Sequence, residues 1–446
     1  MSPLKSVQPS SEVASPFAQA CETPTEQQIA SAQMLLRSVL ELPQQTELFD
    51  LDARSLSRML YTNIVPLWLL ILQRLGGDKT LDETAARLIS HGLDLWPDDQ
   101  SVRQVWGSEN TRASASARTR LLHQHIRDTS ERICHHLSEM SPGVLDGRSV
   151  FVIDGTTIIL PSTAALRKAY PPATHQRGES ANPVAQLMVA ADLQTSCVLS
   201  PQIDPIYGEN NVGEAEQARR IALKLPEKSI ILADADLGIY SVAYQSVAAG
   251  HDIVFRLSHT GFKALCRGAE MIAEGPSHKT YHHLWSPSDK DRKTNPDLPK
   301  DAAIEVVLHD VKLGEGSSLY LASTLKLDAD MTARLYNRRD DIAFDIHDLK
   351  GAMDVEDIYV RGVNLLEDEI HTSIAAYNLA LQFRRQAAKV AKVAPRKLSF
   401  TGIWLSFTYA LLLQSPRSFE EWTTRFDAAL RSAAYRKLPN RSNRRS

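Results

Sequence analysis

Short apolar runs of strand type alternate with helical segments between residues 149 and 256, and this alternation constrains the fold more than any other feature. SVFVIDGTTIIL is rich in β-branched residues, AQLMVAADL and SCVLSPQID follow with a hairpin pattern, and KSIILADAD and DIVFRL are further buried runs. Helical patterns at 213–224 and 239–249 separate the later runs. Strands that alternate with helices predict an α/β core with a mixed sheet.

The segments on either side of this core have different patterns. Residues 1–24 are rich in Ser and Pro, which predicts disorder, and residues 25–145 carry helical periodicity. Residues 259–300 are polar and irregular, and two strand patterns follow, AIEVVLHDVKL and SSLYLASTL. From about residue 328 to 435 the chain is helical again. We therefore expect helical regions before and after the core.

Composition excludes several classes of protein. The formal net charge is −3, so any nucleic acid must be bound by local patches. The four cysteines form no CxxC pair, which argues against metal clusters and disulfides and fits a reducing cytoplasm. The N-terminal sequence has no apolar core of a signal peptide, and the apolar run IVPLWLLIL is too short to span a bilayer. We expect a cytoplasmic protein without a membrane partner.

Asp154 lies inside the first strand-type run. A charge in so apolar a run is unfavourable unless it is paired or binds a cation, so one interpretation is a metal ligand. The alternative is an Asx-turn before Gly155, because Asp-Gly is a common turn signal. A haloacid-dehalogenase-like phosphatase is excluded, because its DxDGT motif needs an acid where Val152 stands.

Asp234 ends a second buried run, SIILAD, and Asp236 follows two residues later. Acids at the ends of adjacent strands lie where α/β sheets hold their sites. The alternative is an aspartate that caps the loop after its strand. The sequence leaves both interpretations open.

The stretch LYNRRDDIAFDIHDLK at 335–350 carries an ordered polar row. At about 100° per residue, one helix face presents Tyr336, Arg339, Asp340, Ala343, His347 and Lys350. An apolar stripe about 100° away holds Leu335, Ile342, Ile346, Leu349 and Met353. A solvated charged face is one explanation of the polar row, and contact with phosphates by Tyr, Arg and Lys side chains is the other.

In this order, these residues resemble the DDE transposases of bacterial insertion sequences, specifically insertion-sequence family four. The signature of that family is Tyr, two residues, Arg, three residues, Glu, six residues, Lys, and Tyr336, Arg339 and Lys350 fall on it. The DGTT run matches the first catalytic acid at Asp154, and the LAD run matches the second at Asp234. Flanking stretches such as AAYNLALQFRRQAA and RKLSF are also similar.

The resemblance implies a ribonuclease-H-like mixed sheet flanked by helices, with a β-rich insertion, a helical N-terminal domain and a helical C-terminal region. It divides the chain into a disordered N-terminus (1–24), a helical, DNA-binding domain (25–145), the first part of the catalytic core (146–258), the insertion (259–325), and the catalytic helix with C-terminal helices and a basic tail (326–446).

The family activity implied is hydrolysis at insertion-sequence ends, dependent on Mg²⁺ or Mn²⁺, followed by strand transfer. The implied assembly is a dimer in a synaptic complex with double-stranded DNA at transposon ends, in a cytoplasmic, nucleoid-associated location. Asp154 and Asp234 would be catalytic metal ligands, and Tyr336, Arg339 and Lys350 would contact DNA phosphates. Family members also hold a flipped base against an aromatic of the insertion, but we expect Trp285 to be a core residue.

The centre of the signature departs from the family, because Ala343 stands where the catalytic glutamate belongs. A methyl group cannot ligate a metal, and Ala235 also replaces an arginine that often follows the second aspartate. We therefore predict a transposase with impaired catalysis. The alternative is a non-catalytic DNA-binding protein, either a transposition inhibitor or a host-adopted regulator. Asp340 and His347, each one helical turn from Ala343, are the candidate substitutes for the lost ligand.

Basic residues between 384 and 397 have two interpretations, contact with DNA or a solvated helix end. They are Arg384, Arg385, Lys389, Lys392, Arg396 and Lys397. Histidines close together in sequence are expected to be packed or surface residues, not metal ligands. They are His123, His125, His135, His136, His282 and His283.

Overall fold

β1 (Val150–Ile159) is the strand around which the sheet is organised, and its first four residues are buried as their apolar, β-branched sequence predicts. In the computed structural model it pairs antiparallel with β4 (Val184–Asp192), which pairs antiparallel with β5 (Val198–Pro205). On its other side β1 pairs parallel with β6 (Ile230–Ala233). The predicted hairpin is therefore β4 and β5.

The structure describes residues 70–71, 73–75, 83–84, 123–139, 143–176, 178–314, 317–353, 360–412 and 428–438. Most of the predicted helical domain at 25–145, and the predicted disordered segment at 1–24, lie outside these residues. The domain boundaries therefore stay a prediction.

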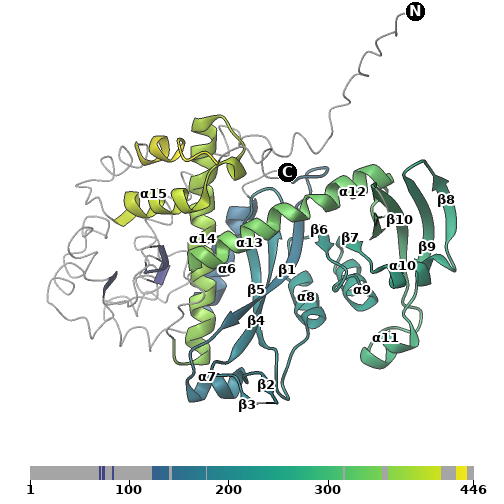
Figure 1. Cartoon of the computed structure of the whole chain (residues 1–446), viewed down its shortest axis with the longest axis horizontal. Coiled ribbons are helices and arrows are strands. Elements are labelled where there is room, and N and C mark those ends of the chain that lie inside the picture. Colours follow the sequence, from purple (N-terminus) through teal and green to yellow (C-terminus); the bar gives the residue numbers. More distant parts are fainter. Residues whose placement is uncertain are drawn as a thin grey trace, which may run out of the picture.

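Beyond β6 the same sheet continues through β7 (Asp252–Arg256), which is parallel to it. Four antiparallel strands then extend the sheet: β11 (Ser317–Ser323), β10 (Ile304–Gly314), β9 (His278–Trp285) and β8 (Glu270–Glu274). The full order is β5-β4-β1-β6-β7-β11-β10-β9-β8. In Figure 1 the strands of the expected β-rich insertion lie on the opposite side of the molecule from α14.

The expectation that residues 259–300 are irregular is wrong. They hold α10 (His259–Cys266), β8, β9 and α11 (Asp289–Thr294). β8 is exposed along its whole length at the edge of the sheet, so it lacks the buried apolar residues by which sequence patterns identify a strand.

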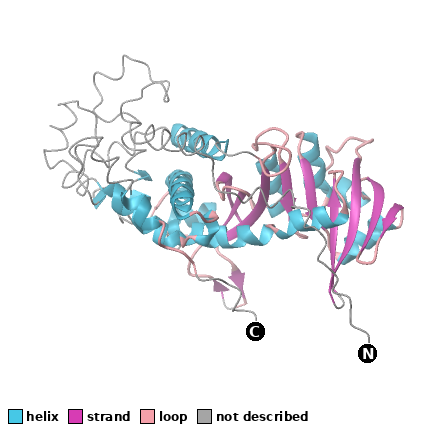
Figure 2. Cartoon of the chain, turned by 90° about the horizontal axis from the view of Figure 1, so that it is seen from above, coloured by secondary structure: helices cyan, strands magenta, loops and turns pink. Residues whose placement is uncertain are grey.

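Helices flank the mixed sheet, as predicted for the fold class (Figure 2). α8 (Glu214–Ala222) packs on β4 and β5, and α9 (Tyr240–Ala248) packs on β7. The long α14 (Val363–Ala391) lies along α6 (His123–Glu139) and against β5. The smaller elements are α7 (Ala164–Ala169), β2 (Thr174–His175), β3 (Gly178–Glu179), η6 (Pro395–Lys397) and α15 (Phe400–Leu412).

The polar row in 335–350 spans two helices rather than one. α12 (Ala329–Asn337) begins after the N-cap Asp328 and ends at Asn337, with Arg338 as its C-cap. α13 (Arg339–Met353) begins at the next residue. The described residues of the apolar stripe are buried as predicted: Leu335, Ile342, Ile346 and Leu349. Among the described residues, no helix is both long enough and apolar enough to cross a membrane.

Candidate active site on β1 and at the end of β6

Asp154 lies within β1, and the strand continues past it, so the predicted alternative of an Asx-turn at Gly155 is wrong. The backbone N–H of Gly155 donates to Asp154 Oδ1 at 2.9 Å. The second oxygen, Oδ2, is left for a partner outside the strand, and the side chain is 28% exposed. Asp154 is therefore fixed by the sheet, and its side chain remains partly exposed.

Asp234 follows β6 directly, and the interpretation that it caps the following loop is confirmed. Its Oδ1 caps the loop, accepting from the backbone N–H of Asp236 at 3.1 Å and of Leu237 at 3.2 Å. The loop then packs so closely on β7 that a Cβ at Gly238 would lie 1.9 Å from the Arg256 carbonyl oxygen. These contacts fix the carboxylate and leave Oδ2 free to face Asp154.

Arg339, the first residue of α13, joins the two aspartates. Its Nη2 lies 3.2 Å from Asp154 Oδ2 and 3.3 Å from Asp234 Oδ2. The two carboxylates thus share a single cationic nitrogen, although they come from different strands. One positive charge for two negative ones leaves a net negative charge at this point.

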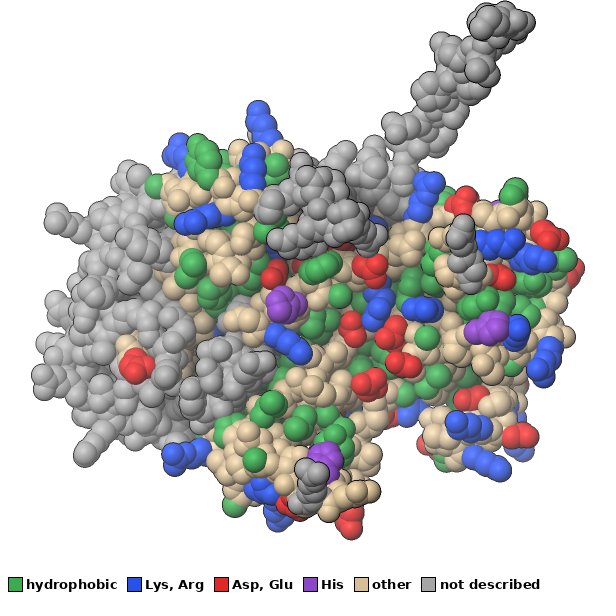
Figure 3. Space-filling view, in the orientation of Figure 1, with side chains coloured by type: hydrophobic (Ala, Val, Ile, Leu, Met, Phe, Trp, Pro, Cys, Tyr) green, Lys and Arg blue, Asp and Glu red, His purple; other side chains and the backbone are tan. Residues whose placement is uncertain are grey.

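The pKa shifts of the acids also indicate a net negative charge at this site. The pKa of Asp154 is raised, chiefly because burial disfavours its charged form, while Arg339 and the Gly155 hydrogen bond oppose the rise and Asp234 adds to it. Glu214 at the start of α8 belongs to the same negative region, since burial and the charges of Asp234, Asp236 and Asp154, in that order, raise its pKa. Figure 3 shows acidic side chains gathered near the middle of this face.

Glu214 was missed by the sequence analysis. The available signal was an acid at the start of the helix between β5 and β6, which places it near the strand end that carries Asp234.

The other residues of the predicted polar row on α13 differ in exposure. Ala343, Asp340 and His347 are exposed on α13, and Lys350 is half-buried further along it. In the described part of the chain, neither Asp340 nor His347 makes a hydrogen bond or ion pair with Asp154 or Asp234.

Tyr336 differs from the prediction that it lies on the presented face, because it is only 6% exposed. The break between α12 and α13 interrupts the regular 100° steps on which that prediction depended. Burial raises the pKa of Tyr336, and the nearby charges of Arg339 and Arg256 oppose the rise.

The donor set suits a hard divalent cation. Carboxylate oxygens are the ligands that Mg²⁺ and Mn²⁺ prefer, and the guanidinium of Arg339 already places positive charge between two of them. Across the described ranges, no three side chains of His, Cys, Asp or Glu converge into a ready-made metal site. The aspartate pair therefore fits a cation but does not enclose it.

Two expectations for residues outside this site can also be decided. Arg384 and Arg385 are buried, so neither DNA contact nor a solvated helix end describes them. Arg384 instead donates to the Pro395 and Leu398 carbonyls, which fastens α14 to η6. Trp285 is buried against Tyr240, as the prediction of a core residue requires.

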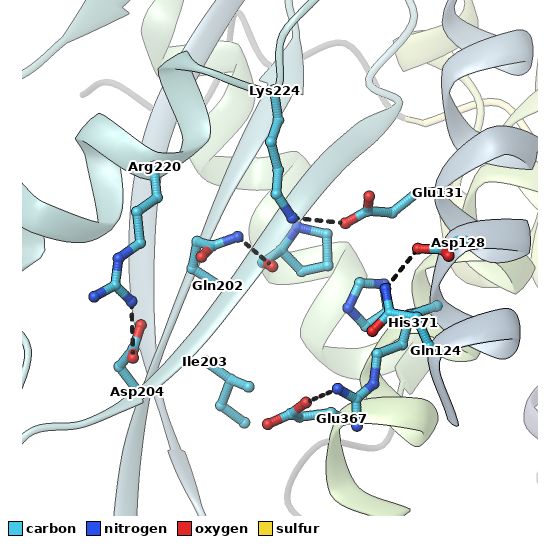
Figure 4. A pocket seen from close by; sticks show the side chains of 12 residues that line it. Gln124, Asp128, Glu131, Gln202, Ile203, Asp204, Arg220, Lys224, Glu367 and His371 are labelled. Atoms are coloured by element: carbon cyan, nitrogen blue, oxygen red, sulfur yellow. Dashed lines mark hydrogen bonds and ion pairs between the residues drawn. The ribbon is translucent and has the colours of Figure 1, made fainter. Parts of the chain in front are cut away.

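A polar hollow of about 300 Å³ lies between β5, α6, α8 and α14 (Figure 4). Six of the charged side chains that line it form three ion pairs: Arg220 with Asp204, Lys224 with Glu131, and Arg127 with Glu367. The carboxylates of these pairs are therefore already held by a neighbouring cationic side chain.

Comparison with known families agrees with the geometry. A family model described as "Transposase DDE domain" matches residues 145–379, which include β1, β6 and α13. No match to a curated protein was found.

Proposed function

The chain belongs to the transposase DDE domain family, and on that premise we propose that it is an insertion-sequence transposase, of insertion-sequence family four, whose own catalysis is impaired. The proposed reaction is hydrolysis of a phosphodiester at the transposon ends, followed by strand transfer. The observation that supports it most directly is the convergence of Asp154 Oδ2 and Asp234 Oδ2 on one cationic nitrogen.

Asp154 and Asp234 are the proposed ligands of Mg²⁺ or Mn²⁺. A bound divalent cation would activate the attacking water and stabilise the leaving oxygen. Arg339 and Lys350 are proposed to position DNA phosphates, with Tyr336 supporting Arg339 from its buried position. The Nε of Arg339 supports this role, since it is a buried donor without a partner among the described residues.

The impairment follows from Ala343. Its methyl group is exposed on α13, where the family signature has a glutamate, and it offers no lone pair to a cation. The proposed partners are double-stranded DNA at the element's ends and a second copy of the chain in a synaptic complex. If catalysis is lost altogether, the second candidate function is DNA binding without cleavage, as an inhibitor of transposition or a host-adopted regulator.

The test is cleavage of a labelled duplex carrying the terminal repeats of the element that encodes the protein, with Mg²⁺ or Mn²⁺. The protein is compared with Ala343→Glu, and Ala343→Gln is the matched control because it adds the same length without a carboxylate. We expect cleavage with Ala343→Glu at a rate at least about a hundredfold above the other two proteins.

The outcomes separate the two candidate functions. Cleavage by the unmodified protein at the rate of Ala343→Glu would contradict the impairment. Salt-sensitive DNA binding without cleavage by any of the three proteins would favour the non-catalytic binding protein. If none of them bound or cleaved the duplex, the proposed transposase function would be wrong.

A further inference from the structure

We propose that Arg256, the last residue of β7, binds a backbone phosphate of the DNA strand that lies at the aspartate pair. The inference rests on the proposed function, because it names a further substrate-binding residue of the same site. It adds a cationic side chain from the sheet to the residues of α13 that are proposed to contact phosphates.

Arg256 lies in the same cross-strand row as the two aspartates. In the register of the parallel neighbours β1, β6 and β7, Val152 is aligned with Leu232, and Leu232 with Val254. Two residues further along each chain stand Asp154, Asp234 and Arg256. Residues aligned on parallel strands point to the same face of the sheet, and neighbouring strands lie about 4.8 Å apart. Arg256 therefore flanks Asp234 on the side away from Asp154.

The backbone of Arg256 is held in this position from both sides. The loop after Asp234 approaches so closely that a Cβ at Gly238 would lie 1.9 Å from the Arg256 carbonyl oxygen. On the other side, Arg256 lies opposite Leu321 in the pairing of β7 with β11. The side chain of Arg256 is nevertheless exposed. The sheet thus fixes where this guanidinium starts and leaves its end accessible to a ligand.

The guanidinium of Arg256 is not committed to the aspartates. Both of the ion pairs that Asp154 and Asp234 make in the described chain go to Arg339, and Arg256 pairs with no described acid. Its charge instead lies near Tyr336, because burial raises the pKa of Tyr336 and the charges of Arg339 and Arg256 oppose that rise. Arg256 is therefore a cationic group beside the acids that keeps its charge for an external partner.

Two buried donors close to Arg256 also need an acceptor. The Tyr336 hydroxyl and the Nε of Arg339 are buried, and neither has an acceptor among the residues that the structure describes. Buried donors are normally paired, so donors without an acceptor suit a ligand that is rich in oxygen. α12, which carries Tyr336, packs on β7, which carries Arg256.

The order of charges along the row fits a phosphodiester. Asp154 and Asp234 would hold the divalent cation at one end, and Arg256 stands at the other. The planar fork of a guanidinium matches two oxygens of one phosphate, with charge-assisted hydrogen bonds. Figure 3 shows Lys or Arg side chains directly beside the acids gathered on this face. A DNA strand laid across the row would meet a cation and a guanidinium in sequence.

The test is binding of the full chain to a fluorescent duplex that carries the element's terminal repeats, without divalent cations, at a series of NaCl concentrations. Arg256→Gln removes one phosphate contact, so we expect about tenfold weaker affinity and a salt slope smaller by about one. Arg267→Gln is the matched control, because Arg267 is also exposed and pairs with no described acid, but lies at the end of α10. It should change the affinity less than about twofold.

A second series identifies the phosphate. One uncharged methylphosphonate is placed in turn at each phosphate around the end of the element. At the contacted position it should weaken binding by the unmodified protein and have no further effect on Arg256→Gln, because the two changes remove the same interaction. Equal losses in both proteins at every position would show that Arg256 contacts no phosphate there.

The outcomes separate this inference from the proposed function. If the unmodified protein binds the duplex and Arg256→Gln matches it in affinity and salt slope, or if Arg267→Gln loses as much as Arg256→Gln, the inference is overturned while the function stands. If the unmodified protein does not bind the duplex, both fail. Should Arg256→Gln not fold, Arg256→Lys keeps the charge without the fork and should bind roughly threefold more weakly with an unchanged slope. Unchanged affinity in that variant would equally overturn the inference.

Discussion

α13 takes part in two Arg–Asp clusters that differ in burial and in the ratio of charges. At its start, Arg339 serves both Asp154 and Asp234, whose side chains are 28% and 30% exposed. One turn and a half later, Asp345 is 2% exposed and has two arginine neighbours. Arg396 Nη2 lies 2.7 Å from Asp345 Oδ2, and Arg384 Nη1 lies 4.0 Å from Oδ1.

The difference agrees with the proposal that the first cluster is functional, and it marks the second as structural. Two half-buried acids that share one base carry a net negative charge, and their side chains are partly exposed to solvent. One buried acid that is shared by two bases has its charge fully compensated and links α13 to α14 and η6. Burial also lowers the pKa of Arg384, and the neighbouring Asp345 opposes that shift. Such a pair keeps the helices in place but is closed to a ligand.

Asp345→Asn should have the largest effect on stability. It leaves Arg384 and Arg396 facing a neutral amide in a buried position, and the loss of one partner of a buried pair destabilises a protein by about 3–5 kcal/mol. Urea unfolding followed by circular dichroism measures the change. Asp341→Asn is the control, because Asp341 is 47% exposed and lies 3.9 Å from Arg396. It should change stability by less than about 1 kcal/mol. Equal losses in both variants would show that burial does not distinguish these carboxylates.

The free energy of unfolding should also depend on pH through a second buried polar group, His309, which like Asp345 is closed to solvent. His309 is fully buried between Thr280 and Thr332, and burial lowers its pKa from 6.5 to about 4. Below pH 6.5 the His309 imidazole therefore binds a proton in the unfolded chain, whereas in the folded chain it binds one only below about pH 4. The free energy of unfolding should fall as pH falls through this range, by on the order of 3 kcal/mol.

His309→Gln should flatten that dependence, measured by urea unfolding at a series of pH values. His282→Gln is the control, because His282 is 42% exposed on β9 and pairs with Glu305. A slope that survives in His309→Gln would assign the acid sensitivity to other groups.

The sequence predicted the fold class and much of the candidate site because both depend on local patterns. β1 and β6 are short apolar runs that a core requires, and the acids Asp154 and Asp234 follow in an order that parallel strands bring to one edge. The apolar stripe of α13 was predicted for the same reason, since burial enforces a helical period.

What the sequence did not predict depends on partners far along the chain. Arg384 and Arg385 have the composition of a surface, and their burial follows from contacts of α14 with α13, η6 and β5. Arg339 shows no sign in sequence that it bridges residues 105 and 185 positions away. Glu214 was overlooked because an acid in the first turn of a helix is common for reasons of helix stability, and only the crossover from β5 to β6 brings this one near the strand end that carries Asp234.

The smallest expected effect is a change in Mn²⁺ affinity, and it tests the first cluster, in which Arg339 joins Asp154 and Asp234. Arg339→Gln removes the single positive charge between Asp154 and Asp234, and the carboxylates then have no internal competitor for a cation. A half-exposed ion pair contributes up to about 1 kcal/mol, so Mn²⁺ affinity measured by calorimetry should rise about fivefold. Arg334→Gln removes the same charge from an exposed position on α12 and should leave the affinity unchanged. A fall in affinity with Arg339→Gln would mean that the guanidinium holds the two aspartates in position for the cation. Arg339 would then have a structural role in the metal-free protein, as the arginines around Asp345 do.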